Sequence, residues 1–111
     1  MDTWRFTVRL NADQAEVILS EKLCGKFGAS LSDKREILLP NHKSKVLVFS
    51  KFYKRFASVF GLTVVLDDKT AYCDVTLTAS CGKKGAPIVG DLGSSFDFCR
   101  EARNILEPYI I

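Results

Sequence analysis

Four cysteines have the richest chemistry in this sequence, because a thiolate can bind metal, form a disulfide or attack a substrate. They are Cys24, Cys73, Cys81 and Cys99. None forms a C-x-x-C pair, and no histidine stands at the spacing of a zinc site. The pattern favours reduced, buried thiols that act as small hydrophobic groups. A disulfide or a four-thiolate metal site is the alternative, and we predict no metal and no cofactor.

Few side chains could act as a general acid or base. His42 is the only histidine, and it lies in a predicted turn without the positioned partner that a general base needs. Asp67 and Asp68 are adjacent acids at a predicted hairpin tip, where such pairs usually form the turn. No serine or cysteine has an evident base. We therefore predict no catalytic residue and no enzyme activity.

A glycine-containing segment, residues 82–93, follows the last predicted strand and contains Lys83, Lys84 and Gly85. Its glycines match neither the G-x-G-x-x-G pattern nor the Walker pattern, so phosphate binding is not favoured. A loop of this length in a compact domain is typical of a functional or mobile segment. We treat these residues as a candidate gating loop.

Three consecutive strands form the centre of the prediction: Val46–Tyr53, Val59–Leu66 and Ala71–Cys81. The last is the clearest, because apolar and polar residues alternate strictly along it. The segment Val46–Tyr53 also fits the apolar stripe of a helix, but the β-favouring residues at its start favour a strand. An even-numbered loop between the other two pairs Leu66 with Ala71, since a slip of one residue would reverse every side chain.

The flanking segments complete the predicted topology. Asn11 and Gln14 form a capping-box pattern at the start of a helix, and Ser94 caps a second helix near the end. The remaining predicted elements are a first strand over Trp4–Leu10, a helix from Ala12 to about Cys24, and an edge strand over Leu31–Leu39. The order β-α-β-β-β-β-α predicts an α+β fold, with both helices packed on one face of an antiparallel sheet.

Length and composition predict one globular domain, residues 1–111, with 47% hydrophobic and 26% charged residues. The net charge of +3 is too small to indicate nucleic-acid binding. No apolar run approaches the ~20 residues of a membrane span. The first residues do not resemble a signal peptide, so we expect a cytoplasmic protein without a membrane partner.

The element order resembles the TATA-binding-protein-like and helix-grip arrangements, in which a curved sheet wraps a long helix. That likeness of order implies nothing about DNA binding. The string Val46–Arg55 resembles a family of short bacterial proteins of unknown function, and the likeness continues at Leu62–Leu66, Ser80–Gly85 and Leu106–Tyr109. The chain departs from the family where Lys83, Lys84 and Pro87 interrupt an expected run of glycines. The resemblance implies a small cytoplasmic bacterial domain and supplies no activity.

The sheet face opposite the helices is the candidate functional surface. A fully solvated face alternates cleanly to polar residues, whereas this face keeps large apolar groups among threonines and charges. One register of the third strand selects Phe49, Lys51, Tyr53, Arg55, Tyr72 and Asp74. The other register places Ser50 and Phe52 on this face instead.

Two functions follow from this reading. The first is a non-catalytic interaction module that self-associates, most simply as a homodimer, or binds an unknown protein partner through its open sheet face. The second is a small-molecule-binding domain, with a pocket between sheet and helices gated by Lys83, Lys84 and Gly85. Nucleic acid is not an expected partner in either case.

Overall fold

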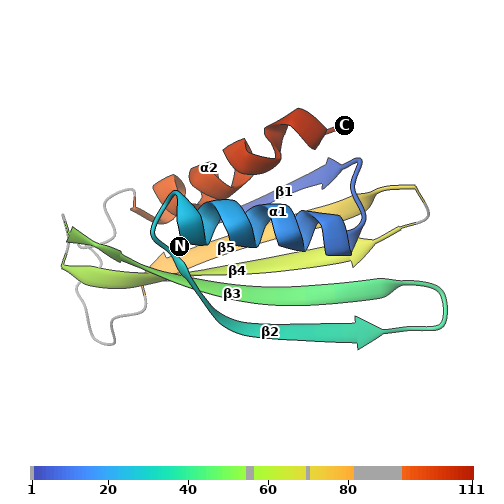
Figure 1. Cartoon of the computed structure of the whole chain (residues 1–111), viewed down its shortest axis with the longest axis horizontal. Coiled ribbons are helices and arrows are strands. Elements are labelled where there is room, and N and C mark those ends of the chain that lie inside the picture. Colours follow the sequence, from blue (N-terminus) through green and yellow to red (C-terminus); the bar gives the residue numbers. More distant parts are fainter. Residues whose placement is uncertain (1, 55–56, 70, 82–93) are drawn as a thin grey trace.

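Five strands form one antiparallel sheet, with strand order β1-β5-β4-β3-β2 (Figure 1). The structure is a computed structural model, and it describes residues 2–54, 57–69, 71–81 and 94–111. The elements are β1 (Asp2–Val8), α1 (Ala12–Gly25), β2 (Ser30–Leu38), β3 (Lys43–Tyr53), β4 (Ser58–Asp68), β5 (Cys73–Cys81), α2 (Ser94–Leu106) and the 3-10 turn η3 (Glu107–Tyr109).

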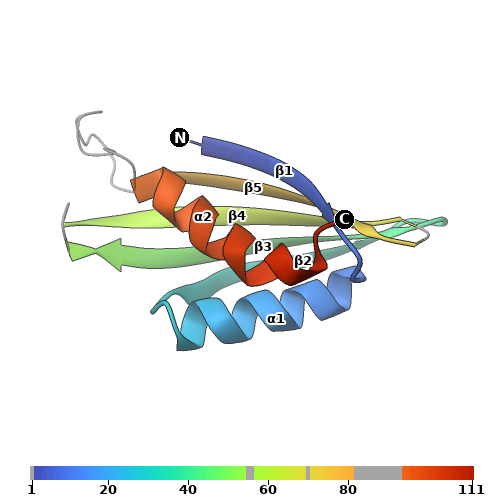
Figure 2. The same ribbon diagram turned by 90° about the horizontal axis from the view of Figure 1, so that it is seen from above.

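Both helices cover the same face of the sheet (Figure 2). Helix α1 contacts β2, β3 and β4, whereas α2 contacts β1, β4 and β5. The predicted α+β class, the element order and the packing of both helices against one antiparallel sheet are therefore confirmed. We call the uncovered side of the sheet the open face.

A capping box starts α1, as the sequence predicts. The backbone N–H of Gln14 donates to Asn11 Oδ1 over 2.8 Å, and the N–H of Asn11 donates to Gln14 Oε1 over 3.1 Å. Asp68, at the end of β4, accepts a further hydrogen bond from the N–H of Ala12 over 2.6 Å. Asp68 is thus more than a turn residue, because its carboxylate ties the first turn of α1 to the sheet.

The β4–β5 hairpin turns later in the sequence than predicted. Asp68 pairs with Cys73, and the N–H of Lys69 donates to the carbonyl of Tyr72 over 2.8 Å. Leu66 consequently pairs with Val75, and the predicted pairing of Leu66 with Ala71 is wrong. The shift is even, so the same alternate residues stay buried.

The hydrophobic core lies between the sheet and the helices. Alternate residues of β3, β4 and β5 meet one face of each helix there, as the predicted stripes of α1 and α2 require. The largest fully buried side chains are Val8, Leu19, Leu23, Leu47, Phe49, Phe60, Leu62, Val64, Leu66, Leu77, Phe98 and Leu106.

The two edges of the sheet differ. The outer edge of β1 is partly covered by the end of the chain, because the N–H of Arg9 donates to Tyr109 and the N–H of Ile111 donates to Thr7. Val8 and Ile110 form the corresponding bridge. Strand β2 forms the other edge, and all nine of its residues are exposed. The prediction of an exposed edge strand at this position is confirmed.

In the part of the chain that the structure describes, neither helix has the length and apolar character needed to cross a membrane.

Candidate interaction surface

Strand pairing fixes which side chains share the open face. Read across β1, β5, β4, β3 and β2, they form transverse rows: Thr7, Asp74, Asp67, Ser44 and Ile37; then Arg5, Thr76, Val65, Val46 and Arg35; then Thr3, Thr78, Thr63, Val48 and Asp33. We call the uncharged middle of the last two rows the central patch: Val46, Val48, Thr63, Val65, Thr76 and Thr78.

Every residue of the central patch is a valine or a threonine, and each is partly exposed. Such β-branched side chains are stiff at χ1, so they lose little conformational freedom when a partner covers them. Charged groups stand only at the borders of these rows, at Arg5, Arg35 and Asp33. An uncharged centre inside a charged rim is the usual anatomy of a protein–protein interface.

One end of the open face is acidic. Asp67 and Asp74 lie directly opposite each other, a pairing that is unfavourable for like charges. Thr7 Oγ1 donates to Asp74 Oδ1 over 2.9 Å, and Ser44 Oγ donates to Asp67 Oδ1 over 2.8 Å. The Ser44 hydrogen bond, with the charge of Lys69, holds the pKa of the Asp67 carboxyl below its usual value. Each of the two carboxylates therefore has a hydroxyl partner on a neighbouring strand.

His42 lies beside this acidic end. Its Nε2 is 3.3 Å from Asp67 Oδ1, and its side chain is 34% exposed. The sequence reasoning placed His42 in a turn without a partner, and the structure supplies one. The contact links the β2–β3 turn to β4.

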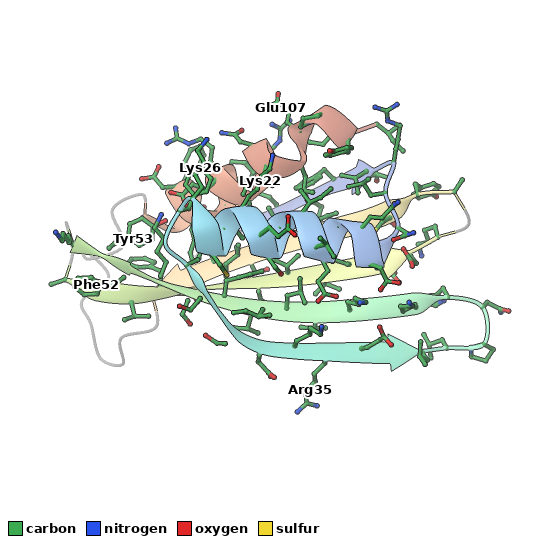
Figure 3. The ribbon with its side chains drawn as sticks, in the orientation of Figure 1. Lys22, Lys26, Arg35, Phe52, Tyr53 and Glu107 are labelled. Carbon is green, nitrogen blue, oxygen red and sulfur yellow. The ribbon has the colours of Figure 1, made fainter. Side chains whose placement is uncertain are left out.

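A hollow of about 430 Å³ opens on the same part of the face, and its lining includes Arg5, Val65 and Asp74. At the opposite end, Phe52 pairs with Val59, and these side chains are 56% and 46% exposed. Figure 3 labels Phe52 near that end of β3. The open face therefore combines a hollow with a charged border, an uncharged centre and an exposed apolar end.

The structure overturns the predicted register of β3. Phe49 pairs with Leu62 on the helix side and is fully buried. Lys51 lies on the same side, where its Nζ is 2.9 Å from Glu101 Oε1 of α2. Placing these two residues on the open face was wrong, because burial under the helices selects the odd-numbered residues of β3. Phe52, from the alternative register, belongs to the open face.

Tyr53 also belongs to the helix side, and its predicted place on the open face is wrong. Its ring centroid lies 5.3 Å from that of Phe60 and 6.0 Å from that of Phe98, in edge-on contacts. Burial raises the pKa of the Tyr53 phenol, and the nearby charge of Glu101 raises it further. The side chain therefore joins β3 to β4 and α2 in the core.

The remaining predicted surface residues have separate outcomes. Asp74 does lie on the open face. Tyr72 is 41% exposed but precedes β5, in the turn closed by Lys69. Arg55 and the predicted gating residues Lys83, Lys84 and Gly85 fall outside the described residues. Val46 and Val48 were missed, although their even spacing along the third strand was a usable signal, and Phe52 was named only in the alternative register.

An ion cluster around one buried lysine joins α1 to β2 and β3 on the helix side. Lys45 is its centre, with a side chain only 8% exposed. The Lys45 Nζ lies 2.5 Å from Glu16 Oε1, 2.6 Å from Asp13 Oδ1 and 3.3 Å from Glu36 Oε2. Lys34 Nζ adds a second contact to Glu16 over 2.8 Å. This cluster positions the edge strand against α1.

Cys24, Cys73 and Cys99 are free thiols. Cys73 and Cys99 are buried as predicted, and burial raises the pKa of Cys73 to about 12 and that of Cys99 to about 11. Cys24 is exposed, so its predicted burial is wrong. Among the described residues, no group of histidine, cysteine and carboxylate side chains is arranged to hold a metal ion.

We expect Cys24 to react with a thiol reagent much faster than Cys73 or Cys99 in native buffer. The thiolate is the reactive species, and burial both shields the other two sulfurs and keeps them protonated. Timed labelling followed by peptide mass spectrometry measures each site. The Cys24→Ser variant should lose the fast labelling of that site, and unfolded protein should label throughout. Equally fast labelling of Cys73 would contradict its burial.

No protein family, curated protein or solved structure matches the chain in comparisons with known proteins. The resemblance to a family of short bacterial proteins therefore stays a prediction.

Proposed function

We propose that the chain is a non-catalytic interaction module that binds a protein through its open face. The observation that carries the proposal is the central patch, where uncharged, partly exposed valines and threonines from three adjacent strands lie inside a charged border. Exposed β-branched side chains on a rigid sheet offer a preorganised contact surface. A bacterial, cytoplasmic origin would suit such a module, and it stays a prediction.

The charges of the open face indicate the chemistry of the partner. Arg5 and Arg35 are balanced by Asp33, Asp67 and Asp74, so the described residues of this face lack the excess of basic groups that a polyanion requires. Nucleic acid is therefore a poor candidate for this surface. A complementary protein would present an uncharged, mainly apolar centre, with basic groups opposite the acidic end.

Val65→Lys should abolish this binding while leaving the fold intact. Val65 is partly exposed in the central patch, so the lysine adds a charge to the middle of the interface and removes no core side chain. Val17→Lys is the matched control, because Val17 is 54% exposed on α1, away from the open face. Both variants would be immobilised and compared with the wild-type chain for proteins captured from an extract.

A protein retained by the wild-type chain and Val17→Lys, but lost from Val65→Lys, would support the proposal. Sedimentation of the purified chain covers the case in which the occupant is a second copy, since Val65→Lys would then remove the oligomer. If Val65→Lys retains every interaction of the control, the open face is not the binding surface. Circular dichroism checks that both variants are folded.

The small-molecule alternative needs a pocket between sheet and helices. That layer holds fully buried side chains, including Phe49, Leu62 and Phe98. Its expected gate, residues 82–93, falls outside the described residues. The alternative stays a prediction, and the described geometry favours the open face.

A further inference from the structure

Strand β2 presents a long, bare edge. It is the last strand of the sheet, and all nine of its residues are exposed (Figure 1). Leu31, Ile37 and Leu38 are 39%, 47% and 71% exposed, which is unusual for an edge that no described residue covers. The opposite edge, at β1, is partly covered by the end of the chain. The sheet is therefore open to extension at β2.

The hydrogen-bonding pattern shows which backbone groups of β2 point outward. The N–H of Leu39 donates to the carbonyl of His42, and pairs along an antiparallel ladder alternate between bonded and non-bonded. Asp33, Arg35 and Ile37 thus bond to β3, whereas the backbone groups of Lys34, Glu36 and Leu38 face away from it. In agreement, the N–H of Lys34 donates to a side chain, Asp33 Oδ1, over 2.8 Å.

We propose that β2 pairs antiparallel with β2 of a second copy of this chain, about a two-fold axis at Arg35. The two five-stranded sheets would then form one continuous sheet. The proposal uses a different surface from the open face and does not rest on the proposed function. Its occupant is a second copy, because Lys34 and Glu36 have opposite charges and lie on either side of Arg35, so each meets the other when the strand is reversed.

The symmetry and the side-chain faces together select the register. A two-fold axis perpendicular to the sheet keeps equivalent faces on the same side, so each residue must pair with one of equal parity. With Arg35 on the axis, Lys34 of each copy lies opposite Glu36 of the other. Both are outward-facing backbone positions, so these pairs exchange hydrogen bonds as well as opposite charges.

The same register also places Arg35 near an opposite charge, and it leaves the irregular end of β2 unpaired. The two Arg35 side chains meet at the axis, but each is diagonal to Asp33 of the other copy, within reach of a long side chain. Figure 3 shows Arg35 projecting from β2 away from the helices. The β2–β3 register shifts between Leu31 and Asp33, and the paired segment, Asp33–Ile37, lies beyond that irregularity. Pairing is thus confined to the regular part of the strand.

Cysteine cross-linking tests both the partner and the register. Arg35→Cys, in a Cys24→Ser background, should form an inter-chain disulfide under mild oxidation. Non-bonded antiparallel pairs bring Cα atoms to about 4.5 Å, a separation that a disulfide spans. Ile37→Cys is the matched control on the same face, because its two copies would lie roughly 13 Å apart at ~3.3 Å per residue. Non-reducing gel electrophoresis measures the disulfide-linked fraction of each variant.

Proline substitution tests the backbone pairing separately. Glu36→Pro removes an outward N–H that β3 does not use, so the monomer should stay folded while the dimer is lost. Glu36→Gln keeps the N–H and removes the same charge, so it should weaken the dimer by less than about tenfold. Sedimentation equilibrium over a concentration series measures both, and circular dichroism confirms folding.

Selective cross-linking of Arg35→Cys, with loss of the dimer in Glu36→Pro, would establish the β2 interface. Equal cross-linking of Ile37→Cys would indicate random collision and overturn the register. A wild-type chain that stays monomeric at every concentration, with no cross-link in Arg35→Cys, would overturn the proposal. A dimer that survives Glu36→Pro but is lost in Val65→Lys would place self-association on the open face instead.

Discussion

Phe49→Ala is expected to lower the free energy of unfolding by about 3–5 kcal/mol, because it empties a closed site in the core. Phe49 is fully buried on the helix side of β3, opposite Leu62. Denaturant unfolding should show a lower midpoint with an unchanged slope, since the change acts on the native core and leaves the exposed area on unfolding similar.

Phe52→Ala is the matched control for this change. Phe52 is on the same strand but on the open face, where it is 56% exposed. Removing the same side chain there should change stability by no more than about 0.5 kcal/mol. Equal losses in the two variants would mean that the open face is a second core, and the proposed binding surface would be wrong.

Lys45→Met is expected to cost about 2–3 kcal/mol, the second-largest effect. Removing one partner of a buried ion pair leaves the other charge without compensation, which lowers the free energy of unfolding by about 3–5 kcal/mol in a fully buried site. The effect is smaller here because Asp13 and Glu36 reach water, with side chains 56% and 41% exposed, and because Lys34 still contacts Glu16. Lys22→Met removes an exposed positive charge of α1 that lies outside the cluster, and it is the control.

The pH dependence of this variant gives an independent check. Hydrogen bonds from Lys45 and Lys43 lower the pKa of Asp13 below 3.8. For Glu16, burial raises the pKa, but hydrogen bonds from Lys34 and Lys45 outweigh it and bring the pKa below 4.5. Both carboxylates therefore contribute stability above their unfolded pKa values, and the contribution is lost as the pH falls through the folded values.

The stability contributed by Lys45 depends on pH in the opposite direction. The hydrogen bonds that Lys45 donates to Asp13, Glu16 and Glu36 outweigh burial and raise the pKa of Lys45, so its contribution is complete below 10.5 and is lost only above that value. At neutral pH Asp13, Glu16 and Lys45 are therefore all charged. The stability difference between wild type and Lys45→Met should therefore shrink on acidification from pH 7 toward about pH 3. A difference that stays constant with pH would show that the cluster contributes no electrostatic stability.

The element order and the burial of β4 and β5 could be predicted, because alternation along those strands is one-sided. The buried face of β3 could not be predicted, and the reason is physical. Its odd positions include Leu47 and Phe49, and its even positions include Val48 and Phe52, so both faces are apolar. Only pairing with β4 and cover by α1 and α2 decide which set is buried, and neither is visible in local sequence.

The ion cluster was missed for a related reason. Asp13 and Glu16 lie one turn apart on α1, but Lys45 is far along the chain and reads as the polar start of a strand. The contacts exist because α1 crosses back over β3 and β2. Charges that meet only through tertiary packing leave no periodic signal. The predicted surface failed at β3 because it depended on the same long-range choice of face.

The bridge between Val8 and Ile110 ties the first strand to the last residues of the chain. Strand β1 also depends on β5 for its other neighbour, so both of its partners are made long after it during synthesis. Its apolar residues, Trp4, Phe6 and Val8, must wait until β5 and Ile110 have been made. Pairings so distant in sequence make folding slower than local hairpins would. The β2–β3–β4 meander can form while the chain is being made, whereas the sheet is complete only after β5 has been made and has paired with β1.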